Sequence, residues 1–210
     1  MTLLKQLKEN KGTVSSALGK QLATEVLAGN RDILSEAIKL INYDDMNVRS
    51  GSAKIIEKIA EISPELVANH LSDLTKCMKY EEAQTRWMVL HIAGLCAELQ
   101  PGISRDFFNE AVKYLNKKYG TVLNDRAITY FGYMGAVSKK DCKNSFPYLI
   151  QSFKLHPNRI TRIFESFERM IDILDKEQKK TLLKFAEKYK ADKMQSNSRW
   201  AKKILRTMNH

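Results

Sequence analysis

Apolar residues recur through most of this sequence three and four positions apart, which is the spacing of one face of an α-helix. Helix breakers are few, with four prolines and nine glycines in 210 residues, so long helices are favoured over strands. The pattern therefore predicts an all-α fold of amphipathic helices. Two stretches that show it clearly are Ala53, Ile55, Ile56, Ile59 and Ala60, and Ile163, Phe164, Phe167, Met170 and Ile171.

An arginine recurs at the start of these apolar stretches, at intervals of 36 to 40 residues. A second amphipathic segment lies between one stretch and the next. Neither segment can bury its apolar face alone, whereas stacked pairs form one continuous core. The sequence thus predicts repeated helical hairpins, each with a first helix, a short turn and a second helix that the arginine opens. The five arginines are Arg49, Arg86, Arg126, Arg162 and Arg199.

The first helices are delimited by residues that typically start or stop a helix. Ser63 and Pro64 suit an N-cap and a first helical position, and Gly120 suits a left-handed helix end. Pro147 predicts a helix that starts late or bends, and Pro157 predicts its end. The predicted first helices lie at residues 64–80, 104–119, 141–156 and 176–190, and residues 16–28 and 31–41 form a further pair.

This repeat resembles the HEAT repeats of the armadillo-like superfamily. The family's second helix typically opens with a small aliphatic residue and an arginine after an acidic or amide residue, and residues 45–49 match this best. The resemblance implies a right-handed superhelical α-solenoid of about five to six helical hairpins. It places a single repeat domain at residues 15–210, after a polar N-terminal segment at residues 1–14. Function stays open, because this superfamily includes scaffolds, transport receptors, chaperones and a few enzymes.

The recurrent arginines allow two interpretations. A row of guanidinium groups could bind anions. The family resemblance implies instead a structural role, in which each arginine packs at the turn between the two helices and donates hydrogen bonds to a neighbouring carboxylate or carbonyl. We favour the structural interpretation.

In such solenoids the second helices usually line the concave face, so positions three, four and seven after each arginine are candidate binding positions. They are apolar in the early repeats, then aromatic, then basic. Tyrosines interleaved with cations can stack on bases and hold phosphates. Alternatively, the tyrosines pack in the core and the cations only solvate a capping repeat. The candidate residues are Tyr130, Tyr133, Arg169, Lys202, Lys203 and Arg206.

The net charge of +11 is unevenly distributed, because residues 150–210 hold fifteen Lys and Arg against seven Asp and Glu, a net charge of +8. A basic end attracts polyanions such as nucleic acid, an anionic membrane or an acidic protein, and the alternative is a merely solubilising surface. The lysines of residues 176–193 belong to a first helix and are expected on its solvated outer side.

Several chemistries lack a signal in the sequence. Cys77, Cys96 and Cys142 form no CxxC pair and have no histidine at metal-ligand spacing, so we interpret them as buried thiols and predict no metal site and no cofactor. No catalytic motif such as GxSxG or HExxH is present, and we predict no catalytic residues. The start lacks the apolar run of a signal peptide, and no segment suits membrane insertion, so cytoplasmic residence is expected.

We therefore predict a non-catalytic binding or scaffold module that holds a protein or peptide on its concave surface. The alternative is a nucleic-acid-binding protein that uses the basic C-terminal half. More remotely, the chain is similar in length and repeat type to the bacterial alkylpurine DNA glycosylases, whose groove is lined by tryptophans and an acidic residue. Trp87 and Trp200 align only loosely with that groove. The partner and the oligomeric state are not predicted.

Overall fold

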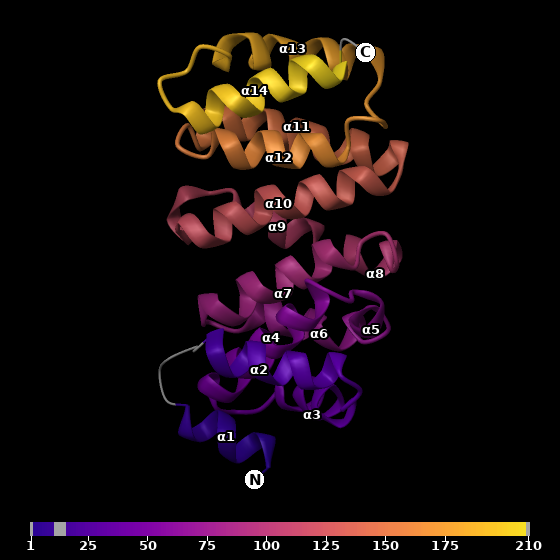
Figure 1. Cartoon of the computed structure of the whole chain (residues 1–210), viewed down its shortest axis with the longest axis vertical. Coiled ribbons are helices and arrows are strands. Elements are labelled where there is room, and N and C mark those ends of the chain that lie inside the picture. The colour runs from indigo at the N-terminus through magenta and orange to yellow at the C-terminus, as the bar shows by residue number, and fades with distance from the viewer. Residues whose placement is uncertain (1, 11–15, 209–210) are drawn as a thin grey trace. The chain divides into compact units, whose positions relative to one another are not determined.

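Residues 2–10 and 16–208 are described by the structure, a computed structural model, and within these ranges the regular elements are helices (Figure 1). The residues divide into two compact units, one up to Glu110 and one from Ala111 onward. We call them unit 1 and unit 2. That residues 15–210 form one domain stays a prediction, and its boundary at residues 14 and 15 lies outside the described residues.

In unit 1 the second helices of successive repeats pack side by side. They are α2 (Ser16–Leu27), α4 (Met46–Ala60) and α7 (Ala83–Leu95), with α4 in contact with both of the others. The central helix, α4, begins where the Asp45 carboxylate accepts hydrogen bonds from the amides of Asn47 and Val48, at 2.7 and 3.2 Å. Its apolar face is fully buried. The remaining elements of unit 1 are α1 (Leu3–Glu9), α3 (Asp32–Leu40), α5 (Glu65–Ala68), α6 (Leu71–Leu74), η1 (Thr75–Lys79) and α8 (Pro101–Arg105).

Two of the predicted first helices are broken into short pieces. Residues 64–80 form α5, α6 and a 3₁₀ turn, η1, instead of one helix. Leu71 and Leu74 of α6 and Cys77 of η1 are buried, and their spacing of three residues fits one face of an α-helix as well as a 3₁₀ helix. Residues 104–119 are divided among α8, α9 (Phe108–Tyr114) and η2 (Lys117–Tyr119).

In unit 2 the second helices are α10 (Thr121–Val137), α12 (Ile160–Arg169) and α14 (Gln195–Met208), and α12 contacts both of the others. Gly132 allows α10 and α12 to approach closely, because a Cβ there would lie 2.7 Å from the Ser166 Cα atom. The first helices are α11 (Lys139–Leu155) and α13 (Lys176–Tyr189). Of the two alternatives predicted from Pro147, a late start or a bend, the late start is wrong, because α11 starts eight residues before Pro147 and contains it.

The predicted polar N-terminal segment contains the helix α1. Its Leu3 and Leu7 are buried, and α1 packs against α3 and α4. Gly51 of α4 makes room for this contact, because a Cβ there would lie 2.7 Å from a methyl carbon of Leu7.

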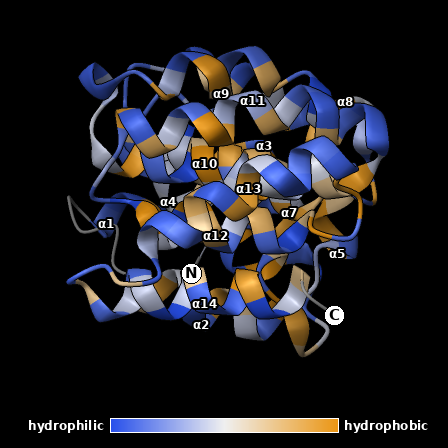
Figure 2. Cartoon of the chain, turned by 90° about the horizontal axis from the view of Figure 1, so that it is seen from above, coloured by the Kyte–Doolittle hydropathy of each residue, from blue (hydrophilic) through white to orange (hydrophobic). Residues whose placement is uncertain are grey.

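The helices are amphipathic, with hydrophobic and hydrophilic residues on the same ribbon, as the mixture of orange and blue shows (Figure 2). Within residues 2–10 and 16–208, no helix has the length and hydropathy needed to cross a membrane.

Candidate functional site

Arg49 joins two repeats of unit 1. Its guanidinium Nε and Nη2 donate to the Glu82 carboxylate at 2.6 and 3.0 Å, and Nη1 donates to the carbonyls of Tyr43 and Asp44 at 2.8 and 2.7 Å. The guanidinium also lies 4.3 Å from the centroid of the Tyr80 ring. Burial raises the pKa of Glu82, but the hydrogen bonds from Arg49, from a backbone amide and from Thr85, together with the Arg49 charge, outweigh burial and hold that pKa below its ordinary value. Arg49 therefore fixes the turn before α4 to the start of α7.

The later repeat arginines differ in their surroundings. Arg86 is half-buried and donates to the Glu81 carbonyl at 2.9 Å. Arg126 is also half-buried. Arg162 is exposed and forms a local ion pair with Glu165 at 2.8 Å, and Arg199 is exposed on α14. A link between repeats is therefore well defined at Arg49, whereas the last two arginines are accessible from solvent.

Tyr130 does not belong to a binding surface, and this part of the prediction is wrong. Its side chain is fully buried and packs edge-on against Phe131, with ring centroids 5.8 Å apart. On α10 and α12 the fourth position after the repeat arginine faces the interior, because Ser166 occupies this position on α12 and is also fully buried. Lys203 holds this position in the last repeat and is exposed on α14.

The structure brings Tyr133 and Arg169 together. The Arg169 guanidinium lies 4.5 Å from the centroid of the half-buried Tyr133 ring, and its Nη1 donates to the Glu165 carbonyl at 2.8 Å. Both residues hold the seventh position after their repeat arginine, on the neighbouring helices α10 and α12. The stacked, hydrogen-bonded arginine is held in place while its side chain stays exposed.

The other predicted cations lie on α14. Lys202 and Arg206, together with Arg199, line a cavity of about 350 Å³ whose other lining residues are the acidic Asp192 and the neutral Gln195 and Ser198. Lys203 forms an ion pair with Glu168 of α12, and its ammonium lies 4.6 Å from the centroid of the Trp200 ring. We call the exposed side chains of Arg162, Arg169, Arg199, Lys202, Lys203 and Arg206, together with the half-buried Tyr133, Glu165 and Glu168, the unit 2 basic face.

A buried polar cluster in unit 1 is absent from the sequence-based candidates. Glu57 is fully buried, and its carboxylate pairs with the Lys54 ammonium at 2.7 Å and with His91 Nδ1 at 2.9 Å. The Lys54 ammonium lies 4.5 Å from the centroid of the Trp87 ring. Burial raises the pKa of Glu57, but the hydrogen bonds from His91 and Lys54, together with the charges of these two residues, outweigh burial and lower it. The sequence signal that could have indicated the cluster is the presence of two charged residues, Lys54 and Glu57, within the apolar stretch after Arg49.

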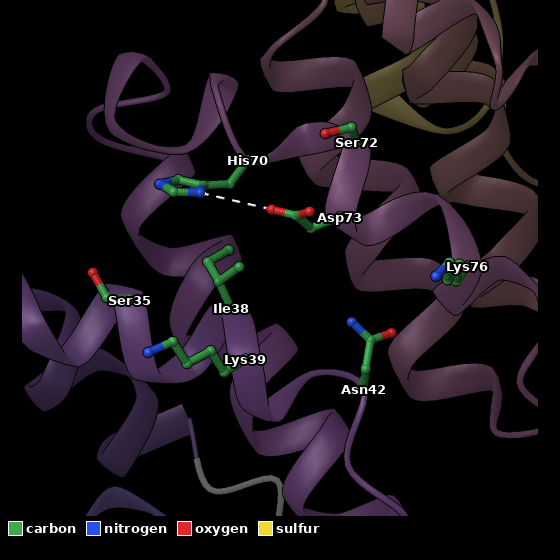
Figure 3. Close-up of a pocket in the computed structure, with 8 residues that line it drawn as sticks. All are labelled: Ser35, Ile38, Lys39, Asn42, His70, Ser72, Asp73 and Lys76. Atoms are coloured by element: carbon green, nitrogen blue, oxygen red, sulfur yellow. Dashed lines mark ion pairs between the residues drawn. The ribbon is translucent and has the colours of Figure 1, made fainter.

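A pocket of about 640 Å³ lies between α3 and the α6–η1 segment of unit 1 (Figure 3). Lys39 and Lys76 come from its two sides, and His70 Nδ1 lies 3.8 Å from the Asp73 carboxylate. None of the predicted binding residues contributes to it. The lining mixes both signs of charge with neutral groups, namely Ser35, Ile38, Asn42 and Ser72.

The three cysteines are free and buried, as predicted. Burial raises the pKa of the Cys77 and Cys96 thiols to about 12 and that of Cys142 to about 11. They are therefore protonated at neutral pH and pack as small apolar side chains.

Comparison with known proteins shows the fold. No protein-family model and no curated protein matches the sequence. Among solved structures, a designed armadillo repeat protein matches with a TM-score of 0.69 and 15% identity over 99% of this chain and 100% of that chain. Two engineered proteins match with TM-scores of 0.63 and 0.60 and identities of 13% and 14%, over 97% or more of each chain. The chain therefore has an all-α, armadillo-like repeat fold, as the sequence predicts.

Proposed function

We propose that this chain is a non-catalytic binding module that holds an acidic segment of a protein partner on the unit 2 basic face. The observation that carries the proposal is the row of accessible cations on two neighbouring second helices. Arg169, Lys202 and Arg206 are exposed, and Arg169 is held in place by its contacts with Tyr133 and Glu165. A guanidinium held in this way loses little conformational entropy when it binds a carboxylate.

The carboxylates on the same face favour a peptide over nucleic acid. Glu165 and Glu168 lie among the cations of α12 and pair with Arg162 and Lys203. A continuous phosphate backbone would meet both carboxylates and be repelled, whereas a peptide can place neutral or donor groups there. Nucleic acid is the second candidate, because the net charge of +8 in residues 150–210 attracts any polyanion.

The test is fluorescence anisotropy with a labelled peptide of alternating glutamate and serine, and with labelled single-stranded DNA and RNA, at several salt concentrations. The test variant is Arg169→Glu/Lys202→Glu/Arg206→Glu. The matched control is Lys176→Glu/Lys180→Glu/Lys184→Glu, which reverses three exposed lysines of the first helix α13 and changes the net charge equally.

We expect the acidic peptide to bind, and the test variant to weaken binding by at least about tenfold while the control variant changes it little. Equal losses in the two variants would show a general charge effect and would contradict the proposal. Binding of nucleic acid but not of the acidic peptide, with the same dependence on the test variant, would establish the second candidate instead.

A further inference from the structure

Three side chains of unit 1 direct ligand-type atoms at one another. Glu57 lies in α4, Glu61 directly follows this helix, and His91 lies in α7. His91 Nδ1 is 2.9 Å from Glu57 Oε1 and 3.9 Å from Glu61 Oε1, and all three atoms lie within 4.8 Å of one another. No metal site is predicted from the sequence, where His91 is 34 residues from Glu57, but the packing of α4 on α7 joins them.

Two lysines orient the carboxylates. Lys54 pairs with Glu57 Oε2 at 2.7 Å, and Lys58 pairs with Glu61 Oε2 at 2.5 Å. Each carboxylate thus gives one oxygen to a lysine and directs the other toward His91 Nδ1. Partners that hold the second atom of a ligand are a common means of fixing metal ligands in place.

The distances agree with those of a metal centre. Ligand atoms about 2.1 Å from a metal lie about 3.0 Å apart at a right angle and about 3.4 Å apart at a tetrahedral angle. The observed 2.9 and 3.9 Å lie on either side of these values, and the two carboxylate oxygens lie within 4.8 Å of each other, so the Glu61 side chain must move toward the other two ligands to hold an ion. One imidazole nitrogen with two carboxylate oxygens suits a transition-metal ion such as Zn²⁺ better than Ca²⁺, which prefers oxygen ligands alone.

We propose that Glu57 Oε1, Glu61 Oε1 and His91 Nδ1 bind one Zn²⁺ ion, a site that is independent of the proposed peptide binding. The ion takes the place of the Nδ1 proton, which moves to Nε2 or to water. The Glu57 side chain is fully buried and that of His91 is 9% exposed, whereas that of Glu61 is 31% exposed, so the ion enters from the Glu61 side. A fourth ligand, from water or a bound molecule, can occupy that side.

The lysines also limit the affinity. They neutralise the two carboxylates before the metal binds, so we expect weaker binding than at a thiolate site of the zinc-finger type. Lys58 is the more accessible of the two lysines, with 21% of its side chain exposed. It can move away from Glu61 as the ion enters.

The probe is Co²⁺, whose visible absorption reports inner-sphere ligands, added to the full chain without a polyhistidine tag. Zn²⁺ then competes in a second titration. The test variants are Glu61→Gln and His91→Gln. The matched control is His70→Gln. His70 Nδ1 also lies near a carboxylate, that of Asp73 at 3.8 Å, but within the described residues this pair is not part of a group of three ligand-type side chains.

We expect the wild-type chain and His70→Gln to bind one Co²⁺ that Zn²⁺ displaces, and each test variant to bind at least about 100-fold more weakly. Circular dichroism verifies that each variant is folded. Glu61 lies at the surface, so Glu61→Gln decides the question even if His91→Gln unfolds. Absence of binding to the wild-type chain, unchanged binding in a folded Glu61→Gln, or loss of binding in His70→Gln alone would each overturn the proposal.

Discussion

Replacing Arg49 with alanine removes the contact that joins the turn before α4 to the start of α7. The Arg49 and Glu82 side chains are only 13% and 14% exposed, so this pair is far less screened than a surface ion pair. The substitution leaves the Glu82 carboxylate and the carbonyls of Tyr43 and Asp44 without their charged donor. Charge-assisted hydrogen bonds contribute about 1.5–3 kcal/mol each, but water reaches part of this site. We therefore expect a loss of about 2–4 kcal/mol in the free energy of unfolding of unit 1.

The assay is urea denaturation followed by tryptophan fluorescence. The chain has two tryptophans, Trp87 in unit 1 and Trp200 in unit 2, so a Trp200→Phe background reports on unit 1 alone. Arg162→Ala, followed with a matching Trp87→Phe background, is the control. Arg162 is exposed and its ion pair is local, so its loss should cost less than about 0.5 kcal/mol.

Acid provides a second test of the same contact. The pKa of Glu82 is lower in the folded chain than its ordinary value, because burial, which raises it, is outweighed by its hydrogen bonds and by the Arg49 charge together, and the bond from Arg49 is the largest of the lowering causes. The resulting stabilisation is present above the unfolded-state pKa and disappears as the pH falls through the folded-state pKa. The difference between wild type and Arg49→Ala should therefore shrink below about pH 4. A loss in Arg49→Ala no larger than that in Arg162→Ala, or a difference that does not depend on pH, would refute this reasoning.

Three further predictions concern burial. Tyr130→Ala should cost about 3–5 kcal/mol in unit 2, because the ring is fully buried, whereas Tyr133→Ala should cost clearly less and should weaken peptide binding. Gly132→Ala should destabilise unit 2 by about 1–3 kcal/mol, because the added Cβ meets the backbone of α12 at Ser166. Unchanged urea midpoints in Tyr130→Ala and Gly132→Ala would contradict these two stability estimates. Cys77 should react with a thiol reagent at pH 8 only as fast as the chain unfolds, since burial raises its pKa to about 12, and fast labelling of the native chain would count against this.

The fold could be predicted from the sequence because its signal is repeated. Helical periodicity and the recurrent arginine locate the second helices, and each stretch supports the others. The first helices could be predicted less well, because two of them are divided into short elements. The spacing of Leu71, Leu74 and Cys77 fits one face of an α-helix as well as a 3₁₀ turn, so it does not indicate that residues 64–80 are broken into short pieces. Helix α1 was missed because Leu3 and Leu7 alone carry its buried side.

The candidate site was only partly predictable, because exposure depends on neighbours that the sequence does not place. Arg169, Lys202 and Arg206 are exposed, and their binding role stays a prediction, whereas alignment of the repeats gives no reason to separate the fourth position from the third and seventh. Packing between α10 and α12 buries that position, and Tyr130 with it. The cluster of Glu57 and His91 depends on a contact between residues 34 apart, for which no spacing rule exists.

The central claim is that an acidic segment binds the unit 2 basic face. Its most direct test is mapping of backbone amide chemical shifts in isotope-labelled protein as the glutamate–serine peptide is added. We expect the largest changes at residues 162–169 of α12 and 199–206 of α14, with little change along α13. Changes concentrated on α13, or at the unit 1 pocket between α3 and α6, would contradict the claim.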